Sequence, residues 1–398
     1  MKSICLYLHI HQPLRFREYS AFDISNKSDY FRGTGRTDNR RIFIKVARNS
    51  YYPMFSILSN LLAGCPRFKI SLSITGTWLV QAQKWAPDLI TMLQKMVKTG
   101  RVEILGETFY HSLSFFYDEA EFSAQVKKHS DLIFKIFGVR PTSFRNTELA
   151  YNDQLAHWAD TYGYKVILAE GWDDILKGRP TGHVYAPKNC KNLRLLLKNY
   201  QLSDDIAFRF SDRKWPEYPL TVSKYLAALE KATSSAPLVN LFMDFETFGE
   251  HQWASTGIFD FFTDFVHTWS TKRAHKFVTV SEAARLETPI DTISVPHALT
   301  WADSERDLSA WRGNSLQDSA MDTLYNLKSQ IFETKDPSLI SDWRLLTTSD
   351  HAYSMCTKYW HDGNVHAYFS AYASPYESFM YFMNILRDLE YRISTHKK

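Results

Sequence analysis

Short apolar runs alternate with amphipathic helical patterns through roughly the first 290 residues of this 398-residue chain. The runs are too short for typical helices, and the whole unit recurs roughly every 30–45 residues. Such alternation is typical of repeated β-α units around a parallel sheet, so we predict an α/β fold that forms a barrel or near-barrel. The predicted strands are Ile4–Ile10, Phe68–Ile74, Val102–Leu105, Pro141–Phe144, Val166–Leu168, Leu193–Leu197, Leu238–Met243 and Phe277–Thr279.

The strand pattern nearly disappears after Thr288-Pro289, and helical patterns take over. We therefore place a boundary near Glu287–Pro296. This predicts a catalytic barrel over residues 1–290 and an α-helical domain over residues 291–398. The predicted helices of the second part are Ser315–Glu333, Pro337–Asp350 and Pro375–Thr395.

Charge and cysteine content narrow the class of function. The chain has 47 basic and 43 acidic residues, a net charge of +4 with no basic stripe, so we expect no nucleic-acid or membrane partner. Its four cysteines form no CxxC pair and predict no zinc or redox motif. The N-terminus lacks a signal-peptide pattern, so a cytoplasmic location is expected, while the oligomeric state cannot be predicted.

Polar residues cluster where the apolar run Leu238–Met243 ends. Asp244, Glu246, His251 and Trp253 follow within a few residues. Acidic residues at a helix N-terminus could explain one of these carboxylates, but not two together with an imidazole and an indole. Carboxylates can move protons or attack carbon, and aromatic faces pack on the apolar faces of sugars. The sequence therefore favours a sugar site at this strand end.

The other predicted strands also end in polar residues. In a parallel sheet all carboxyl ends lie on the same rim, which is where active sites of barrels are found. We therefore expect these residues to meet in one site. They are His9 and His11, Glu107 and His111, Arg145 and Glu148, and Glu170, Trp172 and Asp173.

Two mechanisms fit these residues. In the first, Glu148 and Asp244 form a carboxylate pair that cleaves a glycosidic bond, and Arg145 holds Glu148 ionised by lowering its pKa. In the second, His9 and His11 bind zinc together with a strand-end aspartate, as in a metal-dependent hydrolase or deacetylase. Spacing alone leaves the two nearly equal.

Five segments, in chain order, distinguish the two mechanisms. They are His9–Pro13, Ile104–Leu113, Phe144–Tyr151, Leu241–Trp253 and Leu346–Met355. Together they resemble the five motifs of glycoside hydrolase family 57, the second α-amylase family. The GEHQW sequence that ends at Trp253 resembles the α-amylase-type branch of that family.

The resemblance implies an incomplete (β/α)7 barrel with a helical domain packed on it and contributing to the active site. It also implies cleavage with retention, without a metal or cofactor in the chemistry. It assigns the nucleophile to Glu148 and the general acid/base to Asp244. The substrate-binding residues that it implies, together with strand-end residues that we add, are His9, His11, Glu107, His111, Arg145, Trp172, His251, Trp253 and Asp350.

The sequence thus predicts a retaining, α-amylase-like enzyme that cleaves α-1,4-glucosidic bonds in starch, glycogen or maltooligosaccharides. The alternatives are a 4-α-glucanotransferase on the same scaffold, the metal-dependent hydrolase that uses His9 and His11, and a noncatalytic glucan-binding protein. For Glu246 and Glu250 we expect a role in orienting their loop. Trp301 and Trp311 either reach the site from the helical part or pack between the two parts.

Overall fold

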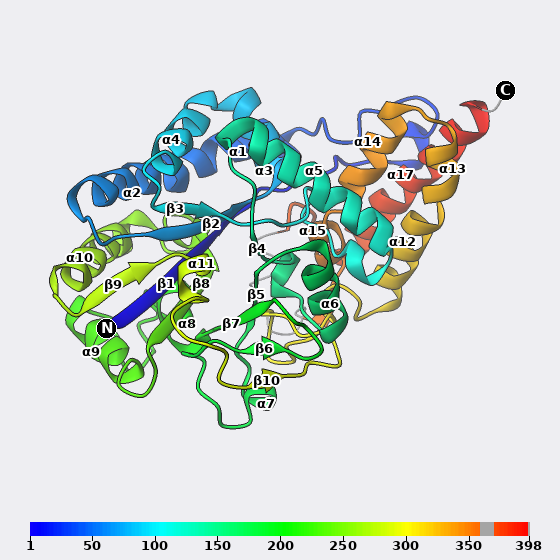
Figure 1. The fold of residues 1–398 in the computed structure, drawn as a ribbon. Coiled ribbons are helices and arrows are strands. Elements are labelled where there is room, and N and C mark those ends of the chain that lie inside the picture. The colour runs from blue at the N-terminus through cyan, green and yellow to red at the C-terminus, as the bar shows by residue number, and fades with distance from the viewer. Residues whose placement is uncertain (359–369, 397–398) are drawn as a thin grey trace.

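A computed structural model describes residues 1–358 and 370–396 and places the first strand at the centre of the fold (Figure 1). This strand, β1 (Lys2–Ile10), pairs in parallel with β2 (Ile70–Ile74) and β8 (Leu238–Asp244). β3 (Val102–Ile104) extends the sheet beyond β2, and β9 (His275–Val278) pairs with the first half of β1. Every residue of β1 after Lys2 is buried, because helices cover one face and the barrel interior covers the other.

A second parallel sheet continues the curved wall of strands that the first sheet begins. It contains β4 (Ser143–Phe144), β5 (Val166–Glu170) and β7 (Arg194–Lys198). A parallel bridge between Gly106 and Phe144 joins it to the β3 end of the first sheet. On its other side, the Asn240 side chain of β8 donates a hydrogen bond of 2.9 Å to the carbonyl of Leu197 in β7. The predicted incomplete (β/α)7 barrel is therefore confirmed.

Helices surround the strands as the alternation predicted. They are α1 (Asn39–Val46), α2 (Tyr52–Gly64), α3 (Gly76–Trp85), α4 (Pro87–Val97), α5 (Glu119–Phe137), α6 (Asp153–Tyr162), α7 (Asp173–Leu176), α8 (Tyr200–Ala207), α9 (Val222–Ala232), α10 (Ile258–Thr271) and α11 (Val280–Ala283). Some of these helices were not predicted. The polar segment that contains Asp204 and Asp205 showed no clear helical pattern, but it forms α8, in which the Asn199 side chain caps the first turn and Leu202 and Ile206 bury one face. Helix α3 was not predicted, and the Thr75 hydroxyl caps it.

The last part of the chain is helical, as expected. It comprises α12 (Ser315–Asn326), α13 (Lys328–Glu333), α14 (Pro337–Leu346), α15 (Ser349–Tyr353) and α17 (Pro375–His396). The longer of these helices gather at one end of the molecule (Figure 1). Their apolar core also includes Phe16, Tyr19 and Tyr30 from the loop after β1. The division at residue 290 stays a prediction, and residues 359–369 and 397–398 of the predicted domain lie outside the described residues.

Two very short strands, β6 (Ala186–Pro187) and β10 (Thr292–Ile293), form a small parallel pair that the sequence did not predict. They tie the segment after the barrel to the loop before β7. In residues 1–358 and 370–396, no helix combines the length and the apolar character that crossing a lipid bilayer requires.

Candidate active site

The register of β1 against β8 builds the first half of the site. His9 is directly opposite Asp244 in the sheet, and His9 Nδ1 lies 3.5 Å from Asp244 Oδ1. The other ring nitrogen, Nε2, lies 3.1 Å from Oε2 of Glu107, which follows β3. Burial lowers the pKa of His9 well below its ordinary value, and the nearby Arg145 charge lowers it further. His9 is therefore a neutral imidazole between two carboxylates near neutral pH.

Three imidazole rings stack in this centre. The His111 ring lies 4.0 Å from that of His11 and 4.9 Å from that of His9, measured between ring centroids. His111 has a positive φ of 52°, which turns its side chain back toward the strand ends. The i, i+2 spacing of His9 and His11 on one strand predicted that both rings would share a face, and they do.

Glu148 is held by donors on both carboxylate oxygens. It follows β4 in a 3₁₀ turn and adopts the left-handed conformation, with φ 58° and ψ 26°. With its proton on Nε2, His111 donates to Oε1 over 3.0 Å, and the Trp301 indole N–H donates to Oε2 over 2.8 Å. A bulky residue in this conformation is strained, and such strain is common where a side chain must be aimed at a substrate. The arrangement fixes the direction of the carboxylate.

Asp244 is more accessible, with 38% of its side chain exposed to solvent. His251 lies in the loop that follows. Burial lowers the pKa of His251, while the negative charges of Asp244 and Glu250 raise it. The two predicted catalytic carboxylates thus occupy two environments, one hydrogen-bonded on both oxygens and one open to solvent.

Asp350 reaches this centre from the helical part of the chain. Its Oδ2 atom accepts a hydrogen bond of 3.0 Å from His11 Nε2, and the backbone N–H of Ser349 donates to the carbonyl of His111. Burial lowers the pKa of His11 to about 4, so this ring is neutral at pH 7. Burial opposes the ionisation of Asp350, but His11 and the neighbouring imidazoles hold its pKa below the ordinary value.

Glu246 lies behind the site and supports its loop. Its Oε1 atom accepts a hydrogen bond of 2.6 Å from the Tyr51 hydroxyl and one of 3.3 Å from the His11 backbone N–H. Burial, with a contribution from the charge of Asp244, raises the pKa of Glu246 to about 8. These contacts agree with the loop-orienting role expected for Glu246.

The ion pair of Arg145 is with Glu107, and its expected influence on Glu148 stays a prediction. The fully buried guanidinium lies 3.4 Å from His9 Nε2 and 4.0 Å from Glu107 Oε2, and its centre is 5.1 Å from the Trp301 ring. The side chains that hydrogen-bond to Glu148 are instead His111 and Trp301. No local sequence signal could have revealed the contact with Trp301, because it joins residues that are far apart in the chain.

Two predicted aromatic residues and one acidic cluster lie outside this group. Trp172 is half-buried against the core around β5. Trp253 is 59% exposed and lies in a groove beside Lys45 and Arg48. Glu170, one of the strand-end residues expected in the site, is buried and bound to Arg306. Its pKa is raised by burial, although Lys198 and Arg306 oppose this effect.

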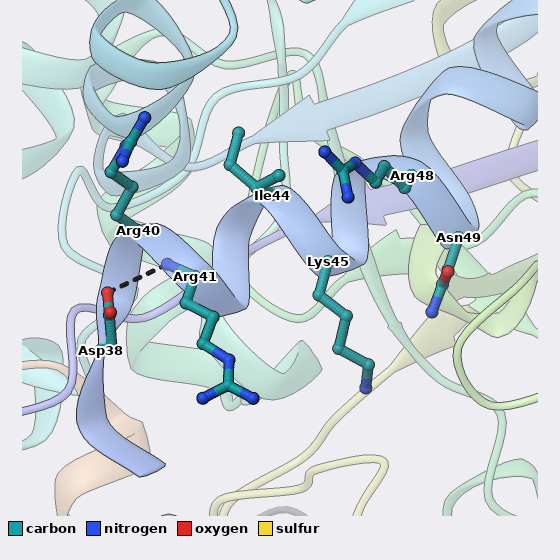
Figure 2. A pocket seen from close by; sticks show the side chains of 7 residues that line it. All are labelled: Asp38, Arg40, Arg41, Ile44, Lys45, Arg48 and Asn49. Carbon is teal, nitrogen blue, oxygen red and sulfur yellow. Dashed lines mark hydrogen bonds between the residues drawn. The ribbon is translucent and has the colours of Figure 1, made fainter. Parts of the chain in front are cut away.

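The groove beside Trp253 continues along helix α1 (Figure 2). The α1 part has a volume of about 600 Å³ and is predominantly basic. None of the residues that line it belongs to the imidazole and carboxylate centre. Its lining residues are Asp38, Arg40, Arg41, Ile44, Lys45, Arg48 and Asn49.

Two overlapping groups in the centre have donor atoms that could hold a metal ion. One consists of His9, Glu107 and His111, and the other of His11, His111 and Asp350. The donor atoms in each group lie within 4.8 Å of one another, and imidazole with carboxylate is a donor set that zinc accepts.

Comparisons with known proteins agree on one family for this chain. The profile described as Glycosyl hydrolase family 57 matches residues 5–296. A protein of Methanocaldococcus jannaschii, provisionally named an alpha-amylase, is 38% identical over 367 residues, which cover 89% of this chain and 77% of that protein.

Solved structures share the fold at low sequence identity. The alpha-amylase AmyC from Thermotoga maritima aligns with a TM-score of 0.65 and 12% identity, covering 99% of this chain and 94% of that one. The 4-alpha-glucanotransferase from Thermococcus litoralis aligns with a TM-score of 0.61 and 17% identity over 87% of this chain. This chain spans about half of that enzyme, 48% of its length.

Proposed function

Because the chain belongs to glycosyl hydrolase family 57, we propose that it is a retaining, α-amylase-like enzyme that cleaves α-1,4-glucosidic bonds of starch, glycogen or maltooligosaccharides. The observation that carries this proposal is the contrast between the two carboxylates. Glu148 has a hydrogen-bond donor on each oxygen, whereas the side chain of Asp244 is partly exposed. A fixed nucleophile and a proton-exchanging acid/base are what double displacement requires.

In the first step, a Glu148 oxygen attacks the anomeric carbon while Asp244 protonates the departing glucosyl oxygen. The carboxylate loses its charge as the glycosyl–enzyme bond forms. In the second step, Asp244 removes a proton from water, the water oxygen bonds to the anomeric carbon, and Glu148 leaves as a carboxylate. Two inversions at one carbon give retention.

The surrounding side chains support substrate binding in this scheme. His9, His11 and His111 present a wall of stacked imidazoles, and Glu107 and Asp350 orient the first two of these rings. The neutral state of His9 and His11 near pH 7 suits the recognition of sugar hydroxyls, because a neutral ring offers both a donor and an acceptor. The cytoplasmic location stays a prediction from the sequence.

The first test is incubation of metal-stripped protein with maltoheptaose, followed by chromatography and by proton NMR of the first products. We expect shorter maltooligosaccharides whose new reducing ends are initially α. Products longer than the substrate would assign the 4-α-glucanotransferase alternative, in which a sugar hydroxyl replaces water in the second step. New ends that are initially β would refute retention.

The two groups of metal-binding side chains support a second candidate, a zinc-dependent hydrolase or deacetylase. If this second candidate is right, the protein will be inactive after metal removal and will act on an acetylated sugar once zinc is restored. We expect the opposite result, with unchanged maltoheptaose cleavage in the chelated protein. Glucan cleavage that requires zinc would overturn the proposed mechanism.

A further inference from the structure

Trp301 contacts Glu148 through both its side chain and its backbone. The indole N–H donates to Oε2 over 2.8 Å, and the Trp301 backbone N–H donates to the Glu148 carbonyl over 3.3 Å. Glu148 has a φ of 58°, a conformation that the surrounding structure must maintain. Trp301 therefore helps to fix both the carboxylate and the strained turn that carries it.

Two cations lie near the Trp301 ring. The guanidinium carbon of Arg145 lies 5.1 Å from the ring centroid, and Nζ of Lys198 lies 5.4 Å from it. Both distances are within the range of cation–π attraction. Arg145 and Lys198 are buried, so solvent screens these interactions weakly.

A buried ion network anchors the backbone of Trp301. One guanidinium nitrogen of Arg306 donates to Oε2 of Glu170 over 2.8 Å and to the Trp301 carbonyl over 3.0 Å. Nζ of Lys198 lies 3.4 Å from the same Glu170 oxygen. The side chain of Glu170, at the end of β5, is fully buried. Burying such charges is costly unless they pair well, so the network has a defined geometry.

We propose that Glu170 and Arg306 are positioning residues for the nucleophile and that they act on Glu148 through Trp301. The inference rests on the proposed function. Glu170 and Arg306 fix the Trp301 backbone. The indole N–H of Trp301 then fixes Oε2 of Glu148. A small displacement of a reacting carboxylate lowers the rate of attack much more than the affinity for the substrate.

The main test compares Trp301→Phe with a matched control, Trp343→Phe. Phenylalanine keeps an aromatic ring and removes the N–H donor in both variants. The Trp343 indole donates to the Leu324 carbonyl over 2.7 Å, in the core of the helical part. For maltoheptaose cleavage we expect Trp301→Phe to lower kcat roughly 10- to 100-fold, the range for one hydrogen bond to a charged group, with little change in KM. The acid limb of kcat/KM should also move to higher pH, and Trp343→Phe should change neither quantity.

Glu170→Gln supplies the second arm of the test. It removes the charge but keeps an oxygen that can accept from Arg306. We expect a smaller loss of kcat in the same direction, and no additional loss when this change is combined with Trp301→Phe, because both act through one contact. Additive losses would overturn the inference. So would an unchanged kcat and acid limb in Glu170→Gln alone, which can be measured even if Trp301→Phe fails to fold.

Glu148→Gln separates the failure of this inference from the failure of the proposed function. Inactive wild type, or an active Glu148→Gln variant, would refute the function and the inference together. Active wild type and inactive Glu148→Gln, with Trp301→Phe as active as Trp343→Phe, would refute the inference alone. Circular dichroism and thermal unfolding establish that each variant is folded.

Discussion

The Glu148 side and the Asp244 side of the centre differ in how tightly they hold their carboxylate. Glu148 receives donors from His111 and Trp301 and occupies a left-handed backbone position. Asp244 ends a regular strand, is 38% exposed, and has His9 at 3.5 Å. The first environment restricts movement, and the second allows exchange of protons with water. In the proposed mechanism, the fold thus separates attack from proton transfer by the rigidity of the two sides.

The strongest test of this comparison is the pair Glu148→Gln and Asp244→Asn. We expect both to lose at least about 1,000-fold in kcat on maltoheptaose, because each removes a covalent or proton-transfer role. With an α-maltosyl fluoride, whose leaving group needs no protonation, Asp244→Asn should still form the glycosyl–enzyme and Glu148→Gln should not. Mass spectrometry of the intact protein would detect the adduct. Equal behaviour of the two variants on the fluoride would contradict the assigned roles.

A smaller effect is expected where the helical part supports the barrel. Asp350→Asn removes the charge that His11 Nε2 contacts at 3.0 Å but keeps the shape of the side chain. We expect a loss of roughly 10- to 100-fold in kcat/KM, consistent with one hydrogen bond to a charged group. Steady-state kinetics would measure it. A wild-type value would mean that the charge of Asp350 does not contribute to the site.

Asp350 also illustrates what the sequence could predict. The apolar runs identified the strands of the barrel, because strands buried on both faces read as continuous hydrophobic segments. Their ends then indicated most of the centre, including His9, His11 and Asp244. The motif resemblance, rather than periodicity, placed Asp350 in a site built mainly by the barrel.

The directions of side chains could not be predicted in the same way. Arg145 lies on the expected strand end but turns toward His9 and Glu107, whereas Trp301 occupies the place beside Glu148. The positive φ angles of His111 and Glu148 likewise set the directions of those two side chains, and no local pattern in the sequence predicts them. Helix α8 was missed because its apolar face contains few residues and its cap is a local side-chain interaction.

The Asp244 side of the centre can also be tested through the pH dependence of stability, because Glu246 supports the loop on that side. Burial raises its pKa in the folded protein from 4.5 to about 8. Folding therefore favours the protonated form. The stability gained is complete below pH 4.5 and is lost as the pH rises through about 8.

Glu246→Gln should remove this dependence. The free energy of unfolding of the variant should rise relative to that of the wild type between pH 4.5 and about 8, the interval between the two pKa values. The upper limit is about 5 kcal/mol, from about 1.4 kcal/mol per pKa unit. Urea unfolding at several pH values would test it. A difference that does not change with pH would show that Glu246 is ionised when folded.

The smallest effect is expected at Trp253, which the sequence placed in the site and the structure places in the groove beside Lys45 and Arg48. Because 59% of Trp253 is exposed, its replacement should cost little stability. Trp253→Ala should leave kcat and KM for maltoheptaose close to the wild-type values, with Phe259→Ala in the same groove as the matched control. A large rise in KM confined to Trp253→Ala would mean that the substrate extends from Asp244 along this loop, and the open side of the centre would then be a binding surface as well as a path for protons.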